Sequence, residues 1–210
     1  MARFADRLFA RLYDPLFAKI EREGLTDMRR QCLAQASGEV LELGAGTGLN
    51  LEHYPDAVTR LVLTEPEEAM ASQLQRKLAD AGREAEVHIA DAQRLPFPDN
   101  SFDTVTTTLV LCTAPDPHVV LAEASRVLRP GGLFLFMEHV RAEEGSPIAK
   151  WQDRVEKPWG FIAGGCHPNR RTAATLESSA LEVVNLQQTE MPKGAGPLVR
   201  PMIIGAARAA

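Results

Sequence analysis

Short apolar runs alternate with longer amphipathic stretches after the first forty residues, and this alternation predicts a mostly parallel α/β sheet. Five runs are typical of buried strands: Glu39–Leu43, Arg60–Thr64, Glu86–Ala90, Thr104–Leu111 and Leu133–Glu138. Three stretches between them favour helices: Leu49–His53, Glu67–Ala81 and Pro117–Leu128. The expected core is therefore a Rossmann-like, doubly wound sheet.

The end of the chain departs from this alternation. Leu181–Met191 and Pro201–Ala207 both have strand character, and only the turn-rich segment Pro192–Pro197 separates them. A connection this short suits a hairpin, because parallel neighbours need a longer crossover. We therefore expect seven strands, mostly parallel, with a C-terminal antiparallel hairpin.

Two segments stand apart from the predicted sheet. The segment 141–171 is rich in glycine and proline and holds both tryptophans, Trp151 and Trp159. We interpret it as an irregular insertion over the active site; the alternative is a surface excursion that the tryptophans anchor. We expect residues 1–36 to form a helical lid or packing segment before a catalytic domain at 37–210.

The first twenty residues carry apolar side chains on one face of a helix, although Asp14-Pro15 is expected to kink or split it. The face consists of Phe4, Leu8, Leu12, Leu16 and Ile20, with Phe9, Tyr13 and Phe17 alongside. Three interpretations stay open: a lid over a bound cofactor, packing against the body, or peripheral membrane contact helped by Arg3, Arg7 and Arg11.

Composition limits the partners. The chain has 210 residues, 45% of them hydrophobic, and a net charge of −5, which suits one globular domain and no nucleic-acid partner. Cys32, Cys112 and Cys166 are widely spaced, so they suggest neither a disulfide framework nor a zinc site, and we expect a reducing cytoplasm. Charged residues interrupt the apolar N-terminus, so no signal peptide or membrane span is expected. Nothing in the pattern indicates an oligomeric state.

A glycine-rich loop, Gly44-Ala45-Gly46-Thr47-Gly48, follows the first predicted strand. Such a loop lets the chain turn sharply and lets a ligand touch the backbone. A dinucleotide fingerprint would need glycine at position 49, where this chain has Leu49, and Glu42 lies just before the loop. The loop therefore favours a nucleoside ligand other than NAD.

Acidic residues end the next two strands. Glu65 follows Thr64, where a carboxylate can accept hydrogen bonds from both hydroxyls of a ribose. The alternative is a solvated charge at a helix start, since Pro66 follows it. Asp91 and Ala92 end the third strand.

Together these features resemble the class I S-adenosylmethionine-dependent methyltransferases, as do Leu95–Asp103 and Arg129–Gly132. The resemblance implies S-adenosylmethionine as cofactor, no metal, and a hydrogen bond from the adenine amino group to Asp91. The implied cofactor-binding residues are Glu42, Gly44, Ala45, Gly46, Gly48, Glu65, Pro66, Asp91, Ala92, Thr108 and Leu109.

From Val40 to the C-terminus the chain is also similar to the methyltransferase-like alkyl-thiol S-methyltransferases, which in animals are endoplasmic-reticulum and lipid-droplet proteins. The segments that carry this similarity are Thr108–Cys112, Arg126–Gly132, Phe136–Val140, Trp151-Gln152, Pro158-Trp159, Gly165-Cys166, Arg170 and Leu198–Pro201. His167-Pro168 interrupts the pattern, and the N-terminus holds no long apolar anchor. The similarity implies a small, hydrophobic thiol as the methyl acceptor.

A thiol reacts as its thiolate, so a base near the acceptor would help at neutral pH. His139 ends the fifth strand, on the side of this fold where the acceptor is expected, and we interpret it as that base. The alternative is a structural strand cap. The predicted acceptor pocket consists of Tyr13, Cys112, His139, Trp151, Trp159 and Cys166, although both cysteines could equally be small buried apolar residues.

Three other functions stay open from the sequence. The chain could methylate a phospholipid amine or a quinone-type carbon, or bind the cofactor as a regulatory protein without catalysis. An NAD-dependent oxidoreductase is the weakest alternative, because the third glycine of its fingerprint is absent.

Overall fold

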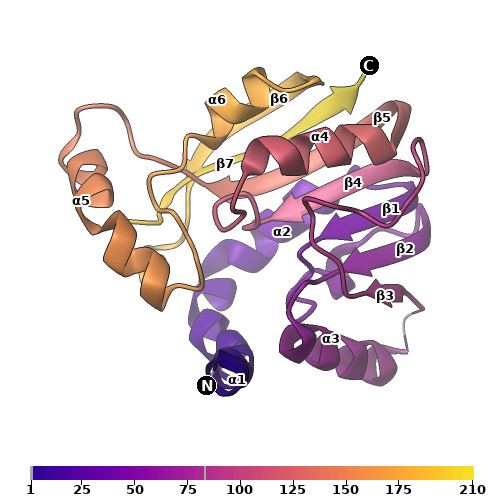
Figure 1. The fold of residues 1–210 in the computed structure, drawn as a ribbon, viewed down its shortest axis with the longest axis horizontal. Coiled ribbons are helices and arrows are strands. Elements are labelled where there is room, and N and C mark those ends of the chain that lie inside the picture. Colours follow the sequence, from indigo (N-terminus) through magenta and orange to yellow (C-terminus); the bar gives the residue numbers. More distant parts are fainter. Residues whose placement is uncertain (1, 83) are drawn as a thin grey trace.

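The computed structural model describes residues 2–82 and 84–210, with side chains described from residue 10 onward. It contains one seven-stranded sheet in the order β3-β2-β1-β4-β5-β7-β6 (Figure 1). The strands are β1 (Gly38–Leu43), β2 (Val58–Thr64), β3 (Glu86–His88), β4 (Phe102–Thr108), β5 (Leu128–His139), β6 (Leu181–Glu190) and β7 (Pro201–Ala209). β7 runs antiparallel to β5 and β6, and all other pairs are parallel. The expected fold class is confirmed.

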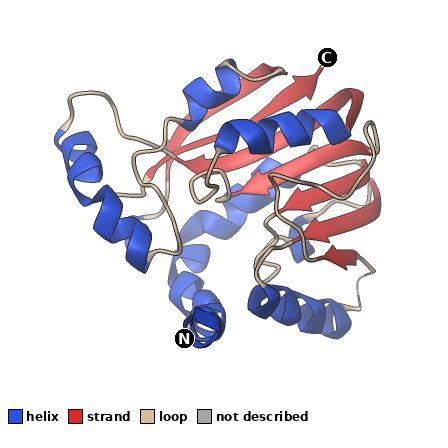
Figure 2. Ribbon diagram, viewed as in Figure 1, coloured by secondary structure: helices blue, strands red, loops and turns tan. Residues whose placement is uncertain are grey.

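Both faces of the sheet are buried under helices. Successive side chains of a strand point to opposite faces, so one strand contributes to two cores. In β5, Phe134 and Phe136 join one core, while Leu135 and Met137 join the other. Helices α4 (Pro117–Val127) and α6 (Thr172–Glu177) pack on the first core, whereas α2 (Thr26–Leu33) and α3 (Glu68–Ala81) pack on the second (Figure 2).

Three predicted elements are shorter than the sequence pattern suggested. β4 ends at Thr108 rather than residue 111, because Leu109 adopts a left-handed backbone with φ 61° and turns the chain. β3 is an edge strand that pairs with β2 over only three residues. The helix expected at Leu49–His53 is a single 3₁₀ turn, η2 (Leu51–His53).

The segment 141–171 is more regular than expected. It contains a 16-residue helix, α5 (Pro147–Ile162). Ser146 caps this helix by accepting a hydrogen bond from Ala149 N, and Pro147 occupies its first turn, where a missing N–H costs nothing. The expectation of irregular structure was wrong over these residues, and the position of the segment over the active site stays a prediction. In Figure 1, α5 lies beside the body of the molecule, away from the sheet.

Helix α1 (Ala2–Ile20) continues through Pro15, so the expected split at that residue was wrong. The helical path instead breaks in the short π-helix η1 (Glu21–Leu25) at Gly24, whose φ of 132° only glycine adopts readily. Phe17 and Ile20 pack on the second core, but Leu12 and Leu16 are exposed. The side chains of Arg3, Phe4, Arg7, Leu8 and Phe9 lie outside the described residues. Within the described part of the chain, no helix has the length and apolar character needed to cross a membrane.

Candidate active site

The glycine-rich loop leaves β1 beside β4, at the point where the strand order of the sheet reverses and ligands of such folds bind. Gly44 and Gly46 have φ of 63° and 58°, which side chains rarely tolerate. A side chain on Gly44 would come within 2.8 Å of Val110, so the loop packs tightly there. A side chain on Gly46 would meet nothing within 4 Å. A ligand can therefore approach the backbone at Gly46.

Glu65 connects the end of β2 to this loop. Its side chain is only 6% exposed, and its two carboxylate oxygens accept hydrogen bonds from Gly46 N and Glu67 N, each at 2.9 Å. Burial raises the pKa of Glu65. Glu65 is thus a buried anchor at the loop, not a solvated charge, although its bond to Glu67 N also supports the start of α3.

Glu42 lies in a buried polar network behind the loop. Its carboxylate accepts hydrogen bonds from Asn50 Nδ2 and Tyr54 Oη, both at 2.8 Å. Burial raises the pKa of Glu42. Asn50 Nδ2 also donates to Thr108 Oγ1 at 2.9 Å, so the network joins β1 to the end of β4. Glu42 therefore fixes the neighbours of the loop.

Arg29 completes this network, and no motif in the sequence predicted it. The residue is 3% exposed, and its guanidinium donates to Asn50 Oδ1 and Thr108 Oγ1, both at 3.1 Å. It also forms an ion pair with Glu21 at 2.9 Å. Arg29 belongs to α2, outside every motif of the strand ends. The one available signal was the position of Arg29 on the apolar, inner face of this helix.

One cavity of about 20 Å³ lies at the centre of these groups. It is lined by Tyr13, Arg29, Glu42, Gly44, Ala45, Gly46, Thr47, Leu49, Asn50 and Thr108. The structure thus brings together six of the predicted site residues. Sites for small molecules usually measure about 300–1,000 Å³, so a nucleoside cofactor fits here only if part of the lining moves.

Helix α1 is the part of the lining that covers the cavity. Asp14 accepts a hydrogen bond from Thr47 Oγ1 at 2.5 Å and pairs with Lys77 Nζ of α3 at 2.6 Å. Tyr13 stacks on Phe17, with ring centroids 4.5 Å apart, and burial of its hydroxyl raises its pKa to about 12. These contacts hold α1 against both the glycine loop and α3.

Other predicted cofactor residues do not line this cavity. Asp91 is exposed after β3, and its carboxylate accepts a hydrogen bond from Gln93 N at 2.9 Å. Ala92 packs at the edge of the first core. Pro66 is exposed beside Glu65, and Gly48 is buried.

Glu138, at the end of β5, holds the loop that follows β4. Its side chain is fully buried and accepts a hydrogen bond from Val110 N at 3.0 Å, and Leu111 and Cys112 also donate their backbone N–H groups to it. Burial raises the pKa of Glu138 to about 7. The strained turn at Leu109 aims these N–H groups at one carboxylate.

Glu138 should give the protein a characteristic pH dependence of stability. Its folded pKa of about 7 lies above its ordinary value of 4.5, so the protonated form stabilises the fold below about pH 5, and this contribution is lost as the pH rises through 7. Between pH 5 and pH 8 we expect the wild type to lose about 2–3 kcal/mol more than Glu138→Gln. Urea unfolding at both pH values measures this difference. The exposed control Glu177→Gln should follow the wild type, and parallel profiles for wild type and Glu138→Gln would contradict the assignment.

Three predicted acceptor residues meet in one buried cluster, Cys112, His139 and Cys166. His139 Nε2 lies 3.0 Å from Cys166 Sγ, and Trp159 Nε1 donates to the same sulfur at 3.2 Å. The His167 N–H donates to the Cys112 carbonyl at 2.8 Å and thereby brings Cys166 to the loop after β4. Cys112, His139 and Cys166 are at most 7% exposed. His139 Nδ1 has no hydrogen-bond partner among the described residues.

Hydrogen bonds within this cluster favour a thiolate on one of its two sulfurs. The bond from Cys112 is the strongest influence, and those from His139 and Trp159 add to it, so the pKa of Cys166 lies below its ordinary value despite burial. The pKa of Cys112 is raised for the converse reason, because its thiol donates to Cys166 and is buried.

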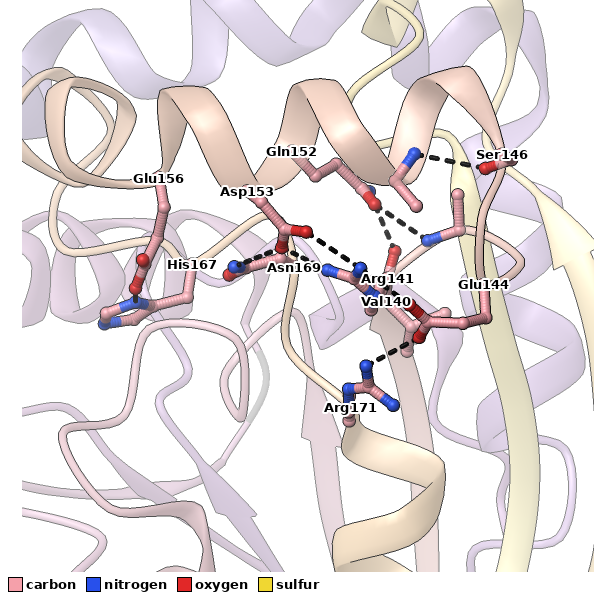
Figure 3. A network of polar contacts seen from close by, with 12 residues as sticks. Val140, Arg141, Glu144, Ser146, Gln152, Asp153, Glu156, His167, Asn169 and Arg171 are labelled. Atoms are coloured by element: carbon pink, nitrogen blue, oxygen red, sulfur yellow. Dashed lines mark hydrogen bonds and ion pairs between the residues drawn. The ribbon is translucent and has the colours of Figure 1, made fainter.

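A polar network fixes α5 against the end of β5 (Figure 3). Gln152, fully buried, accepts a hydrogen bond from Ala142 N at 2.8 Å and donates to the Leu198 carbonyl at 2.8 Å. Arg141 pairs with Asp153 on the next position of the helix. These contacts hold the helix that presents Trp159 to Cys166.

Trp151 is not part of the cluster. Its side chain is 57% exposed, whereas Trp159 is half-buried and bonded to Cys166. Eight helical residues separate the two tryptophans, which places them about 12 Å apart along α5 and about 80° apart around it. We expected both tryptophans to line the acceptor pocket, but the exposed Trp151 does not contact the cluster.

Comparison with known proteins places this geometry in context. A family model described as a methyltransferase domain matches residues 41–136. The chain is 35% identical to thiol S-methyltransferase TMT1B of Rattus norvegicus, over 95% of this chain and 82% of the relative. It is 31% identical to a phosphatidylethanolamine N-methyltransferase of Cereibacter sphaeroides, over 87% and 88%. The structure of geranyl diphosphate methyltransferase with S-adenosylmethionine superposes with a TM-score of 0.71 at 15% identity, over 93% and 89% of the two chains.

Proposed function

Because the chain belongs to the class I S-adenosylmethionine-dependent methyltransferases, and within them to the family of the thiol S-methyltransferases, we propose that it methylates a small hydrophobic thiol. The observation that carries the proposal is the buried cluster of His139, Cys112 and Cys166 at the ends of β4 and β5, beside the glycine loop. An imidazole and a hydrogen-bonded sulfur there form a dry site suited to another sulfur.

The residues at the glycine loop fit the cofactor. The backbone at Gly46 is open to a ligand, and the buried carboxylate of Glu65 lies next to it, ready to accept hydrogen bonds from two ribose hydroxyls. We assign the adenine amino group to Asp91 and the methionine end to the side of the cavity that holds Arg29 and Tyr13. When bound, S-adenosylmethionine supplies a sulfonium-activated methyl group.

The protein must then position and deprotonate the acceptor. Methyl transfer from a sulfonium is an in-line displacement, which needs the acceptor sulfur, the methyl carbon and the leaving sulfur on one line. The acceptor thiol loses its proton before attack, and His139 is the group at the cluster that assists this loss, through Nδ1, the ring nitrogen that has no hydrogen-bond partner among the described residues. Cys166 fixes the ring by its contact at 3.0 Å, and Trp159 fixes Cys166.

Replacing His139 by alanine should slow acceptors according to their acidity. An alkyl thiol with a pKa of about 8.5 is only a few per cent ionised at pH 7, so we expect about 10–100-fold slower methylation. An aromatic thiol that is already ionised at pH 7 should be slowed much less. Initial rates with labelled S-adenosylmethionine measure both, and Trp151→Phe, an exposed aromatic on α5, is the control. Equal slowing of both thiols would make His139 a positioning residue.

A second candidate acceptor is a phospholipid amine. The relative from Cereibacter sphaeroides is named for phosphatidylethanolamine, and the outer side of α5 exposes Trp151, Phe161 and Ile162, which are 57%, 91% and 69% exposed. Such side chains suit contact with a lipid surface. A screen of thiols, phenols and phosphatidylethanolamine vesicles with labelled cofactor separates the two. Labelled lipid with no labelled thiol would overturn the thiol proposal.

A further inference from the structure

Cys112, His139 and Cys166 have the composition and spacing of an incomplete metal site. Their Sγ, Nε2 and Sγ atoms all lie within 4.8 Å of one another. The three residues come from three separate places: the loop after β4, the end of β5, and the turn after α5. Hydrogen bonds hold each place: Glu138 holds the loop of Cys112, β7 pairs with β5 at His139, and the bond from His167 N to the Cys112 carbonyl ties the turn of Cys166 to that loop.

We propose that these three side chains bind a zinc ion, whose fourth position receives the sulfur of the methyl acceptor. Two sulfurs and one imidazole match the ligands of catalytic zinc sites with an open position, and the cluster offers no carboxylate oxygen of the kind that magnesium or calcium requires. The proposal rests on the proposed thiol acceptor and gives His139 a different means of producing the thiolate.

The distances agree with tetrahedral zinc after small shifts. Zinc–sulfur bonds of about 2.3 Å and zinc–nitrogen bonds of about 2.0 Å place tetrahedral ligand atoms about 3.5–3.8 Å apart. His139 Nε2 and Cys166 Sγ are now 3.0 Å apart, in hydrogen-bond contact, and no pair in the cluster exceeds 4.8 Å. Movements of roughly 1 Å or less therefore convert the hydrogen-bonded cluster into a ligand set. Trp159 Nε1 can keep its bond to Cys166 Sγ, as outer contacts of metal ligands do.

The chemistry balances with zinc as an electrophile and no oxidant. Both cysteines bind the ion as thiolates, so Cys112, whose thiol donates to Cys166 in the metal-free cluster, releases its proton to solvent when the ion binds. The acceptor S–H bond then breaks as its sulfur binds zinc, and the proton passes to solvent. The bound thiolate attacks the methyl carbon, and the leaving sulfur of the cofactor takes the electron pair of the broken bond. The product is a neutral thioether, which binds zinc weakly and departs.

Metal binding by the purified full-length protein tests the site directly. The protein is stripped with a chelator, loaded with Zn²⁺ or Co²⁺, and passed through gel filtration. We expect about one equivalent of metal, and for Co²⁺ an absorption from thiolate-to-metal charge transfer. Cys112→Ser, Cys166→Ser and His139→Gln should each weaken binding more than tenfold. Cys32→Ser, which changes the buried cysteine outside the cluster, should bind as the wild type does.

Alkylation of the wild type gives a second measurement that depends on no variant. Zinc should protect Cys112 and Cys166 from iodoacetamide in mildly denaturing buffer but leave Cys32 unprotected, as mapped by mass spectrometry. No retained metal, or equal loss in Cys32→Ser and Cys112→Ser, overturns the zinc site. Undiminished thiol methylation by the metal-free protein overturns the proposed role of zinc in holding the acceptor sulfur and leaves the proposed function intact. Stoichiometric metal without methylation of any thiol keeps the zinc site and removes the thiol acceptor.

Discussion

Replacing Glu65 by alanine is expected to weaken the binding of both S-adenosylmethionine and S-adenosylhomocysteine by about 5–150-fold. The carboxylate is buried beside Gly46, and its loss leaves two ribose hydroxyls of the cofactor without their acceptor, at a cost of about 1–3 kcal/mol. The substitution also frees Gly46 N and Glu67 N, which Glu65 now holds. Calorimetry on the wild type should give a stoichiometry near one for both ligands.

Two further variants test whether the loss of cofactor affinity is specific to the Glu65 carboxylate. Glu67→Ala changes an exposed carboxylate two residues away and should leave affinity within about twofold of the wild type, since exposed charges contribute little. Glu65→Gln keeps one acceptor oxygen and should fall between the wild type and Glu65→Ala. Full cofactor affinity in Glu65→Ala, or tight binding of NADH by the wild type, would contradict the site.

The sequence predicted best those features that depend on local pattern. The short apolar runs of β1 and β2, which are buried continuously toward their ends, and the glycines after β1 are local signals, and they located the ends of these two strands correctly. Glu65 was predictable for the same reason, because it directly follows an apolar strand. The parallel neighbours of a doubly wound sheet then bring such ends to one edge.

Features that depend on distant contacts were beyond the sequence. Cys166 reaches Cys112 only because α5 folds back over 54 residues of chain, and no short spacing marks that pair. The expectation of no zinc site rested on the spacing of the cysteines and on the resemblance to methyltransferases, and neither indicates which side chains meet in the fold. Arg29 and α5 were missed because a polar side chain on an inner helix face, or a helix that contains Pro158, goes against local preference.

The proposed role of the N-terminal helix α1 depends on its movement relative to the glycine loop. The cavity at the glycine loop measures about 20 Å³, and α1 closes it through Tyr13 and Asp14. A cofactor enters only if this helix moves away, and return of the helix would then exclude water from the transfer. We propose that α1 acts as a lid and that the two contacts of Asp14, with Thr47 and Lys77, control how easily it opens.

Deleting residues 1–20 is expected to lower turnover by about 100-fold or more. The truncated protein should still unfold cooperatively, because the sheet and both cores are built from later residues, apart from Phe17 and Ile20 at the margin. Asp14→Ala in the full chain should act through the contacts with Thr47 and Lys77 alone, with faster release of S-adenosylhomocysteine in stopped-flow measurements and a smaller loss of turnover. Lys19→Ala removes the ion pair between exposed Lys19 of α1 and Glu23 of η1 and should change neither rate. A truncated protein that stays folded and keeps full activity would leave α1 as packing or membrane contact, and unchanged release in Asp14→Ala would show that Thr47 and Lys77 do not hold the lid.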